Sequence, residues 1–126
     1  MITGVGTDIV EIDRFRNLEQ KAEFLAQVFT HTEIHSAPNG PSQDTFYATL
    51  FAVKEALLKA LGCGLQQGSV WRDIQISNDW RPHLSGSLGR LAEENLVSKI
   101  HVSHAHAGKS AVAFVLVETT NEEKIL

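Results

Sequence analysis

The segment from about Thr45 to Leu61 constrains this chain most, because it predicts one long and largely buried helix. Its apolar residues recur at the three- and four-residue spacing of a helix face. It ends at Gly62 and Gly64, and glycine commonly follows the last turn of a helix. A helix of this length needs other elements to cover its apolar side, so the remaining segments are expected to pack around it.

The rest of the chain alternates between strand-like and helix-like patterns. Strands are expected at residues 2–12, 70–77, 83–88 and twice within 100–118, with an interruption near Gly108. Further helices are expected from Asp13 to about Val28 and over residues 87–95, and residues 36–42 form a loop. This order predicts an α+β fold with a mainly antiparallel sheet packed on helices, as a single domain spanning residues 1–126.

Composition excludes several classes of function. The chain has 126 residues and a formal net charge of −4 without a basic stripe, so no nucleic-acid partner is expected. No stretch approaches the ~20 apolar residues of a membrane span. We therefore expect no membrane partner, no signal peptide and a cytoplasmic location. Cys63 is the only cysteine, which excludes an internal disulfide, and a structural role is expected for it.

Acidic and basic side chains on two separate elements are candidates for chemistry. Asp8 follows small residues at the end of the first strand, and hard cations prefer such oxygen ligands. Glu55 and Lys59 are four residues apart and share one face of the long helix. Considered alone, Asp8 is more often a turn or cap acid, and the Glu55–Lys59 pair is more often an exposed ion pair.

Histidines alternate near the end of the chain, at His101, His104 and His106. In a strand, His104 and His106 point to the same side. A transition-metal site is one interpretation, but no thiol ligand lies nearby to complete it. Such histidines are more often partly exposed residues of a strand.

Considered together, these segments resemble the holo-acyl-carrier-protein synthase family of small phosphopantetheinyl transferases. The opening segment Gly4–Ile12 (GVGTDIVEI) is similar to the first signature of that family, and Phe51–Gly62 (FAVKEALLKALG) is similar to its second. Asp73–Pro82 resembles the middle strand and turn, and His101–Val117 the closing strands. The resemblance spans nearly the whole chain in the order of the family.

The resemblance implies roles for individual residues. Asp8 and Glu55 would bind Mg²⁺ together with the pyrophosphate of coenzyme A, and Lys59 would contact a phosphate. Aligning on the Ala-x-Ala that follows places His106 at the histidine of the family and Ser103 at its first serine, so both are expected to contact coenzyme A. Lys54 matches the other lysine of the helix motif and is expected to be a surface charge.

The implied reaction moves the phosphopantetheine arm of coenzyme A onto a serine of an acyl carrier protein. Asp8, Glu55, Lys59 and His106 would carry it out, and the proton acceptor would be Glu55 through a bound water, or His106. The resemblance also implies a homotrimer with sites between subunits. Because acyl carrier proteins are acidic, Arg14, Arg16 and Lys21 are expected to form the docking surface.

Several positions depart from the pattern of the family, and they keep an alternative open. Leu50 replaces an arginine, Trp80 replaces a glycine, Ala105 replaces a serine and Ser110 replaces an aromatic residue. A binding module with the same fold, which retains coenzyme A or the carrier protein but has impaired catalysis, is therefore the second hypothesis. A histidine-based metal protein is the third.

Overall fold

The computed structural model describes residues 1–65 and 70–120 of the chain. The α+β prediction is confirmed, and every strand pairing in the described residues is antiparallel. Along the chain the elements are β1 (Ile2–Glu11), α1 (Asp13–Arg16), α2 (Lys21–Val28), α3 (His31–Ser36), α4 (Ser42–Ala60), a short 3₁₀ helix η1 (Trp71–Asp73), β2 (Ile74–Ile76), β3 (Pro82–Leu84), α5 (Gly86–Glu94), β4 (Val97–Ala107) and β5 (Ser110–Thr119).

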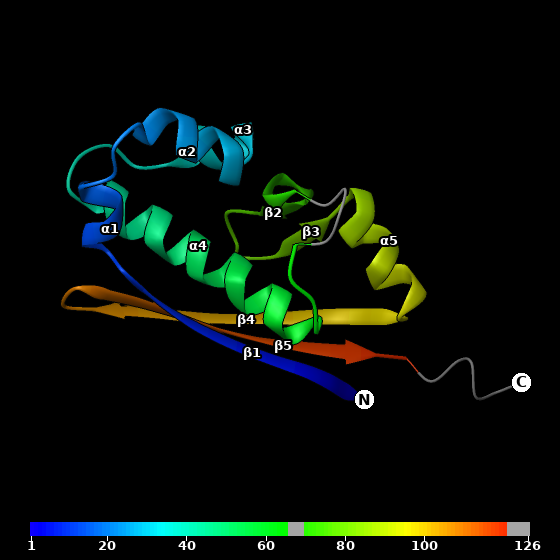
Figure 1. Ribbon diagram of the computed structural model, residues 1–126. Helices are drawn as coiled ribbons and strands as arrows, with labels where there is room; N and C mark the ends of the chain where they lie inside the picture. The colour runs from blue at the N-terminus through cyan, green and yellow to red at the C-terminus, as the bar shows by residue number, and fades with distance from the viewer. Residues whose placement is uncertain (66–69, 121–126) are drawn as a thin grey trace, which may run out of the picture.

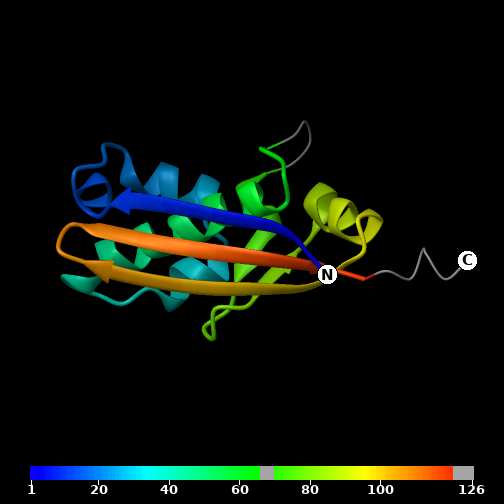
Figure 2. The same ribbon diagram turned by 90° about the horizontal axis from the view of Figure 1, so that it is seen from below.

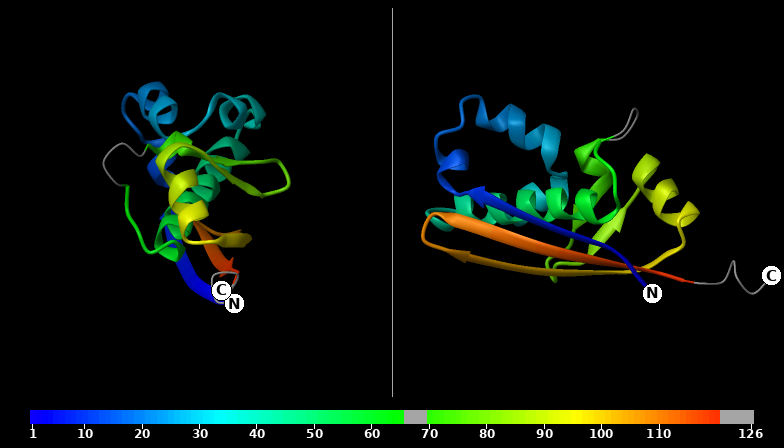
Figure 3. Two further views of the ribbon diagram at one scale, coloured as in Figure 1. Left: turned by 90° about the vertical axis from the view of Figure 1, so that its right-hand side faces the viewer. Right: turned by 60° about the horizontal axis from the view of Figure 1, so that its bottom comes forward.

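The main sheet has three strands in the order β1-β5-β4, and α4 lies along one of its faces (Figures 1 and 2). Helices α2 and α3 cover the other side of α4, so that the helix lies between them and the sheet (Figure 3). Strands β2 and β3 form a separate two-stranded hairpin. Most of α4 is therefore buried, as the sequence pattern predicts for a helix that forms the centre of the core.

Strand β1 packs against α4 unusually closely. A Cβ atom on Gly6 would lie 1.9 Å from the carbonyl oxygen of Ala56, and one on Gly4 would lie 1.8 Å from that of Ala60. From the sequence alone, glycines within a strand would be expected only to loosen it. In the structure they allow backbone-to-backbone contact, which brings the side chains of the two elements within reach of each other.

The expected helix from Asp13 to Val28 is two helices, because Gln20 adopts a left-handed conformation with φ of 51° between α1 and α2. A further helix, α3, was not expected. It begins with a capping box, in which the Thr30 hydroxyl accepts from the backbone N–H of Glu33 and the Glu33 carboxylate accepts from the backbone N–H of Thr30. The expected strand at 70–77 is only three residues long after η1.

Among residues 1–65 and 70–120, no helix lies over the outer face of the main sheet (Figure 2). Four large apolar side chains on this face are exposed: Val5, Ile9, Val112 and Phe114, with exposed fractions between 40% and 68%. Exposed apolar patches of this kind often mark interaction sites. We call these four residues the outer sheet patch.

Candidate active site

Asp8 and Glu55 come together where β1 meets α4. Asp8 lies on the face of β1 that also carries the buried Gly6, and this face is turned toward α4 (Figure 1). Burial raises the pKa of the Glu55 carboxyl group, and the negative charge of Asp8 raises it further. Lys59 and Arg14 have the opposite effect on that pKa. The structure thus places both acids within electrostatic reach of each other in a single chain.

Lys59 joins this pair from the next turn of α4. Its ammonium group donates to the Asp8 carboxylate at 3.1 Å and to the backbone oxygen of Thr7 at 2.9 Å. The ordinary expectation for a Glu–Lys pair four residues apart is an ion pair along the helix. Here the cation reaches across to β1, so Asp8, Glu55 and Lys59 form one cluster of mixed charge.

The donor set of this cluster suits a hard cation bound together with an anionic ligand. Within residues 1–65 and 70–120, no group of three or more His, Cys, Asp or Glu side chains could hold a metal ion. This leaves the proposed histidine-based metal site without a ligand set in that part of the chain. Mg²⁺ is commonly bound by one or two carboxylates plus substrate phosphates and waters, which is what Asp8 and Glu55 can provide.

His106 is not part of the same cluster. It lies on β4, the edge strand opposite β1, and β5 runs between them. Neighbouring strands are ~4.8 Å apart, so the backbones of β1 and β4 are ~10 Å apart. His104 and His106 point to the same side, as expected, and with Thr45, Phe46 and Thr49 of α4 they line a cavity of about 290 Å³.

Ser103 lies on the other face of the sheet from His106. It pairs with Phe114 in the register of β4 and β5, and both side chains are exposed on the outer face. Residues three apart in a strand point in opposite directions, and this could have been derived from the sequence alone. Within one chain, Ser103 and His106, two of the residues expected to contact coenzyme A, therefore do not share a surface.

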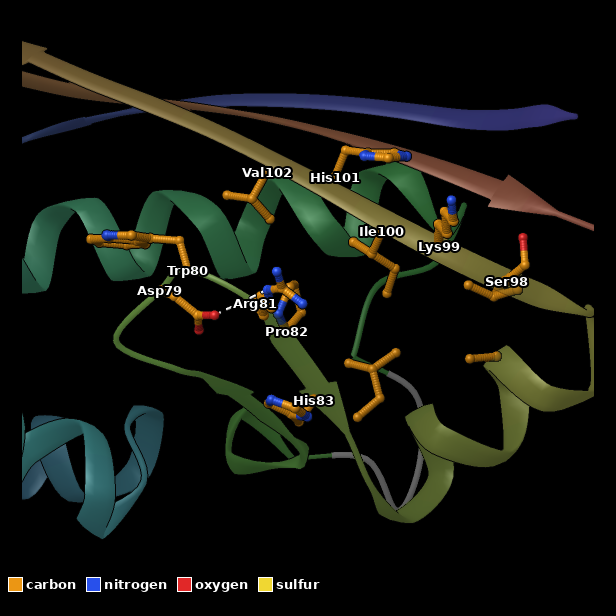
Figure 4. A pocket seen from close by; sticks show the side chains of 13 residues that line it. Asp79, Trp80, Arg81, Pro82, His83, Ser98, Lys99, Ile100, His101 and Val102 are labelled. Atoms are coloured by element: carbon orange, nitrogen blue, oxygen red, sulfur yellow. Dashed lines mark ion pairs between the residues drawn. The ribbon is translucent and has the colours of Figure 1, made fainter.

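Trp80 separates the His106 cavity from a larger groove. It has a left-handed backbone, with φ of 62°, in a position where the resemblance to the family implied glycine. Its ring packs on His104 with ring centres 3.9 Å apart. On its other side, a groove of about 720 Å³ runs between β3 and β4 (Figure 4). Arg81, which is paired with Asp79 at 3.0 Å, and Lys99 supply positive charge to this groove.

The three basic residues expected to dock a partner lie at the start of the helical layer. Arg16 pairs with Asp13 at 3.1 Å and with Asp44 at 3.6 Å, and Lys21 pairs with Asp44 at 2.8 Å. Arg14 lies over the ring of Phe51, 5.1 Å from its centre. Arg14 therefore connects the docking candidates to the Glu55 cluster, because its charge also lowers the pKa of Glu55.

The expectation that Lys54 is a surface charge was wrong. Its side chain is fully buried and its ammonium group lies 2.8 Å from the Glu33 carboxylate, which is also fully buried. Burial lowers the pKa of Lys54, while the charge of Glu33 and its hydrogen bond oppose that change. A lysine in a helix is expected at the surface by default. The sequence does not reveal its partner Glu33, because that residue is 21 positions away in the chain.

Comparison with known proteins identifies the class to which this fold and site belong. A family model described as the 4′-phosphopantetheinyl transferase superfamily matches residues 4–115. The chain belongs to this superfamily, which confirms the resemblance seen in the two signature segments.

Its relatives define the group within the superfamily. A holo-[acyl-carrier-protein] synthase of Geotalea daltonii is 40% identical over 94% of this chain and 99% of that protein, and one of Clostridium novyi is 38% identical over 96% and 91%. The crystal structure of the synthase from Neisseria meningitidis superposes with a TM-score of 0.79 at 30% identity, covering 94% of this chain and all of that one. The Bacillus anthracis synthase, solved in complex with coenzyme A (3′,5′-ADP), gives 0.74 at 30% identity over 95% and 99%.

Proposed function

We propose that this chain transfers 4′-phosphopantetheine from coenzyme A to a serine of an apo acyl carrier protein, with a domain that spans residues 1–126. The observation that carries the proposal is the convergence of Asp8, Glu55 and Lys59 at the contact between β1 and α4, inside a member of the phosphopantetheinyl transferase superfamily. No helix in the described part of the chain is long and apolar enough to cross a membrane. We place the activity in the cytoplasm.

The cluster accounts for the binding of a diphosphate. Two carboxylates alone would repel it, whereas Mg²⁺ bound by Asp8 and Glu55 would supply positive charge and align the phosphate oxygens. Lys59 adds a second cation, and its reach to Asp8 shows that its ammonium group can occupy the space beside that carboxylate. Phosphoryl transfer depends mainly on such positioning and charge stabilisation.

The reaction then needs little covalent chemistry from the protein. The serine oxygen attacks the β-phosphorus, the bond to the leaving group breaks, and 3′,5′-adenosine bisphosphate departs. The serine proton goes to Glu55 through a bound water or to His106. In the absence of a bound cation, burial and the negative charge of Asp8 both raise the pKa of the Glu55 carboxyl group.

We also propose a homotrimer in which neighbouring subunits complete each site. Two observations support it: the outer sheet patch is exposed, and His106 lies on the opposite edge of the sheet from Asp8. A partner chain that covered the outer sheet patch would bury its four apolar residues. A cyclic arrangement would also allow the β4 edge of one subunit to approach the β1 edge of the next.

The acidic carrier protein would approach Arg14, Arg16 and Lys21. Arg16 and Lys21 share Asp44 as an internal partner, so these two cations are held in place before a partner arrives. Arg14 lies nearest to the Glu55 cluster, and its stacking on Phe51 directs it along the surface. The basic surface thus leads toward the reaction site, which suits the delivery of a serine.

Substitution of Glu55 tests the function directly. Glu55→Ala and Glu55→Gln should each lower kcat/KM on the order of a hundredfold or more, because Mg²⁺ binding is worth several kcal/mol to such a reaction. The measurement is the mass gained by an apo carrier protein incubated with coenzyme A and Mg²⁺. Glu94→Ala, an exposed acid at the end of α5, serves as the control. Full activity of both Glu55 variants would contradict the metal assignment, and binding of coenzyme A without turnover by the unaltered protein would favour the impaired module.

A further inference from the structure

Lys54 and Glu33 form a buried ion pair that the reaction does not use. Both side chains have no exposed surface, and the ammonium nitrogen lies 2.8 Å from a carboxylate oxygen. Lys54 directly precedes Glu55 in α4, whereas Glu33 is in α3. The pair therefore connects the residue beside a proposed metal ligand to the helical layer that covers α4.

The ammonium group of Lys54 is held by three acceptors. Besides Glu33 it donates to the backbone oxygen of Val28 at 2.8 Å, and to that of Trp71 at the longer distance of 3.5 Å. Val28 is the last residue of α2 and Trp71 the first of η1. Three different segments thus fix the direction in which the Lys54 side chain leaves α4.

The carboxylate of Glu33 is held equally completely. One oxygen also accepts from the backbone N–H of Thr30 at 2.9 Å, and the other accepts from that of Ile76 in β2 at 2.7 Å. In the part of the chain that the structure describes, no buried side-chain nitrogen or oxygen lacks a hydrogen-bond partner. We call Lys54, Glu33 and these four backbone partners the polar hub.

The polar hub restricts the rotation of α4 about its own axis. Successive residues of an α-helix are ~100° apart, so Lys54 points into the hub while Glu55 points toward β1. On the other side, the contact of Gly6 with Ala56 presses the helix onto β1. A rotation of ~10° would move a carboxylate at the rim of the helix by ~1 Å, which is enough to matter for metal and phosphate binding.

Stability alone does not account for such a pair. Replacing a buried ion pair with well-packed apolar residues is often neutral or stabilising, whereas the hydrogen bonds of charged groups are directional. We propose that Lys54 and Glu33 are positioning residues that set the rotation of α4 and so direct Glu55 and Lys59 at the metal and the diphosphate. This inference rests on the metal site described under the proposed function.

The test separates positioning from stability with three variants. Lys54→Met leaves Glu33 as an unpaired buried charge, and we expect it to unfold at much lower urea concentration. Lys54→Met/Glu33→Leu removes both charges but leaves their backbone partners unpaired, so we expect it to regain only part of the lost stability. Leu88→Ala creates a cavity where α5 packs on the core while keeping both charges of the polar hub, and it supplies a control that is destabilised for another reason.

The decisive measurement is metal affinity, with Mn²⁺ as the probe and the free ion counted by electron paramagnetic resonance. We expect the double variant to bind Mn²⁺ about ten- to a hundredfold more weakly than the unaltered chain, as is typical when the support of a metal ligand is lost. Its KM for Mg²⁺ should rise accordingly, and Leu88→Ala should change neither quantity. Mn²⁺ affinity equal to that of the unaltered chain in the double variant would overturn the inference.

Glu55→Ala in the same assay separates this failure from that of the proposed function. Loss of Mn²⁺ binding in Glu55→Ala together with unchanged binding in the double variant would contradict only the polar hub. Unchanged Mn²⁺ binding in Glu55→Ala would contradict the metal site and the hub with it. If the double variant does not fold, Glu33→Gln keeps the shape of the side chain and takes its place, with the same outcomes.

Discussion

The ring of Trp80, whose backbone is left-handed, packs on the ring of His104 at an interplanar angle of 41°. A left-handed backbone costs a tryptophan on the order of 1 kcal/mol, and the stack with His104 partly offsets this cost. Burial lowers the pKa of His104, and the neighbouring charge of His106 lowers it further. The folded state disfavours the protonated ring of His104. The free energy of unfolding should therefore be constant at neutral pH and fall as the pH drops below the ordinary pKa of an exposed histidine.

Fluorescence can follow this pair. Trp71→Phe leaves Trp80 as the single tryptophan, since the chain has only two. A protonated imidazole quenches an indole in contact with it, so we expect Trp80 emission to fall on acidification, with a midpoint below the pKa of an ordinary histidine. Adding His104→Ala should abolish the transition, whereas His83→Ala, an exposed histidine of β3, should leave it. A transition that persisted without His104 would contradict the stack.

The contact between α4 and β1 depends on Gly6, and substitution there tests it. A methyl group at Gly6 would meet the backbone of Ala56 at 1.9 Å, and backbone cannot move aside as a flexible side chain can. We expect Gly6→Ala to lower the free energy of unfolding in urea by about 1–3 kcal/mol or more, as overpacking does. It should also weaken Mn²⁺ binding, because Asp8 and Glu55 are carried by the two elements that would separate.

Gly64→Ala is the matched control for this substitution. A Cβ atom there would meet nothing within 4 Å, and its backbone is not left-handed, so stability should stay the same or rise slightly. Equal effects of the two substitutions would contradict the argument from close packing.

The same elements show what sequence can predict. The helix over residues 45–61 and the long terminal strands were correctly expected because their apolar periodicity is long and regular. Helix α3 has only six residues and no apolar stripe, but its Thr30-x-x-Glu33 capping box is a signal that could have revealed it. The burial of Lys54 could not be derived, because it depends on contacts made by segments up to 26 residues away in the chain.

The fold as a whole separates the residues of the proposed site. Helix α4 packs mainly on β1 and β5, which places Glu55 and Lys59 with Asp8 and leaves an open cavity over the edge strand β4. His106 lines that cavity. In the proposed trimer, each chain would supply two half-sites from opposite edges of one sheet, and the exposed outer sheet patch would be the surface through which copies join.

Mixing two defective variants tests this arrangement. In the proposed homotrimer, Glu55→Ala and His106→Ala would each damage a different half-site. A mixed trimer would then contain some sites in which an intact Glu55 from one chain meets an intact His106 from the next. Random mixing in equal amounts should restore about one quarter of the sites, because each half must be intact. The transfer assay described above should then show more activity in the unfolded and refolded mixture than in either variant alone.

A mixture of Asp8→Ala and Glu55→Ala supplies the control, because the structure places these two acids in the same chain. Every site in that mixture lacks one of the two carboxylates, so refolding should restore no activity. Phe114→Glu adds a second control, because a charge in the outer sheet patch should prevent trimers. The fold of the single chain should be unaffected, since the side chain at this position is already 41% exposed. We expect it to sediment as a monomer and to abolish recovery in the first mixture. The shared site would be contradicted if neither refolded mixture regained transfer activity and Phe114→Glu were fully active as a monomer. That result would show that each chain carries a complete site.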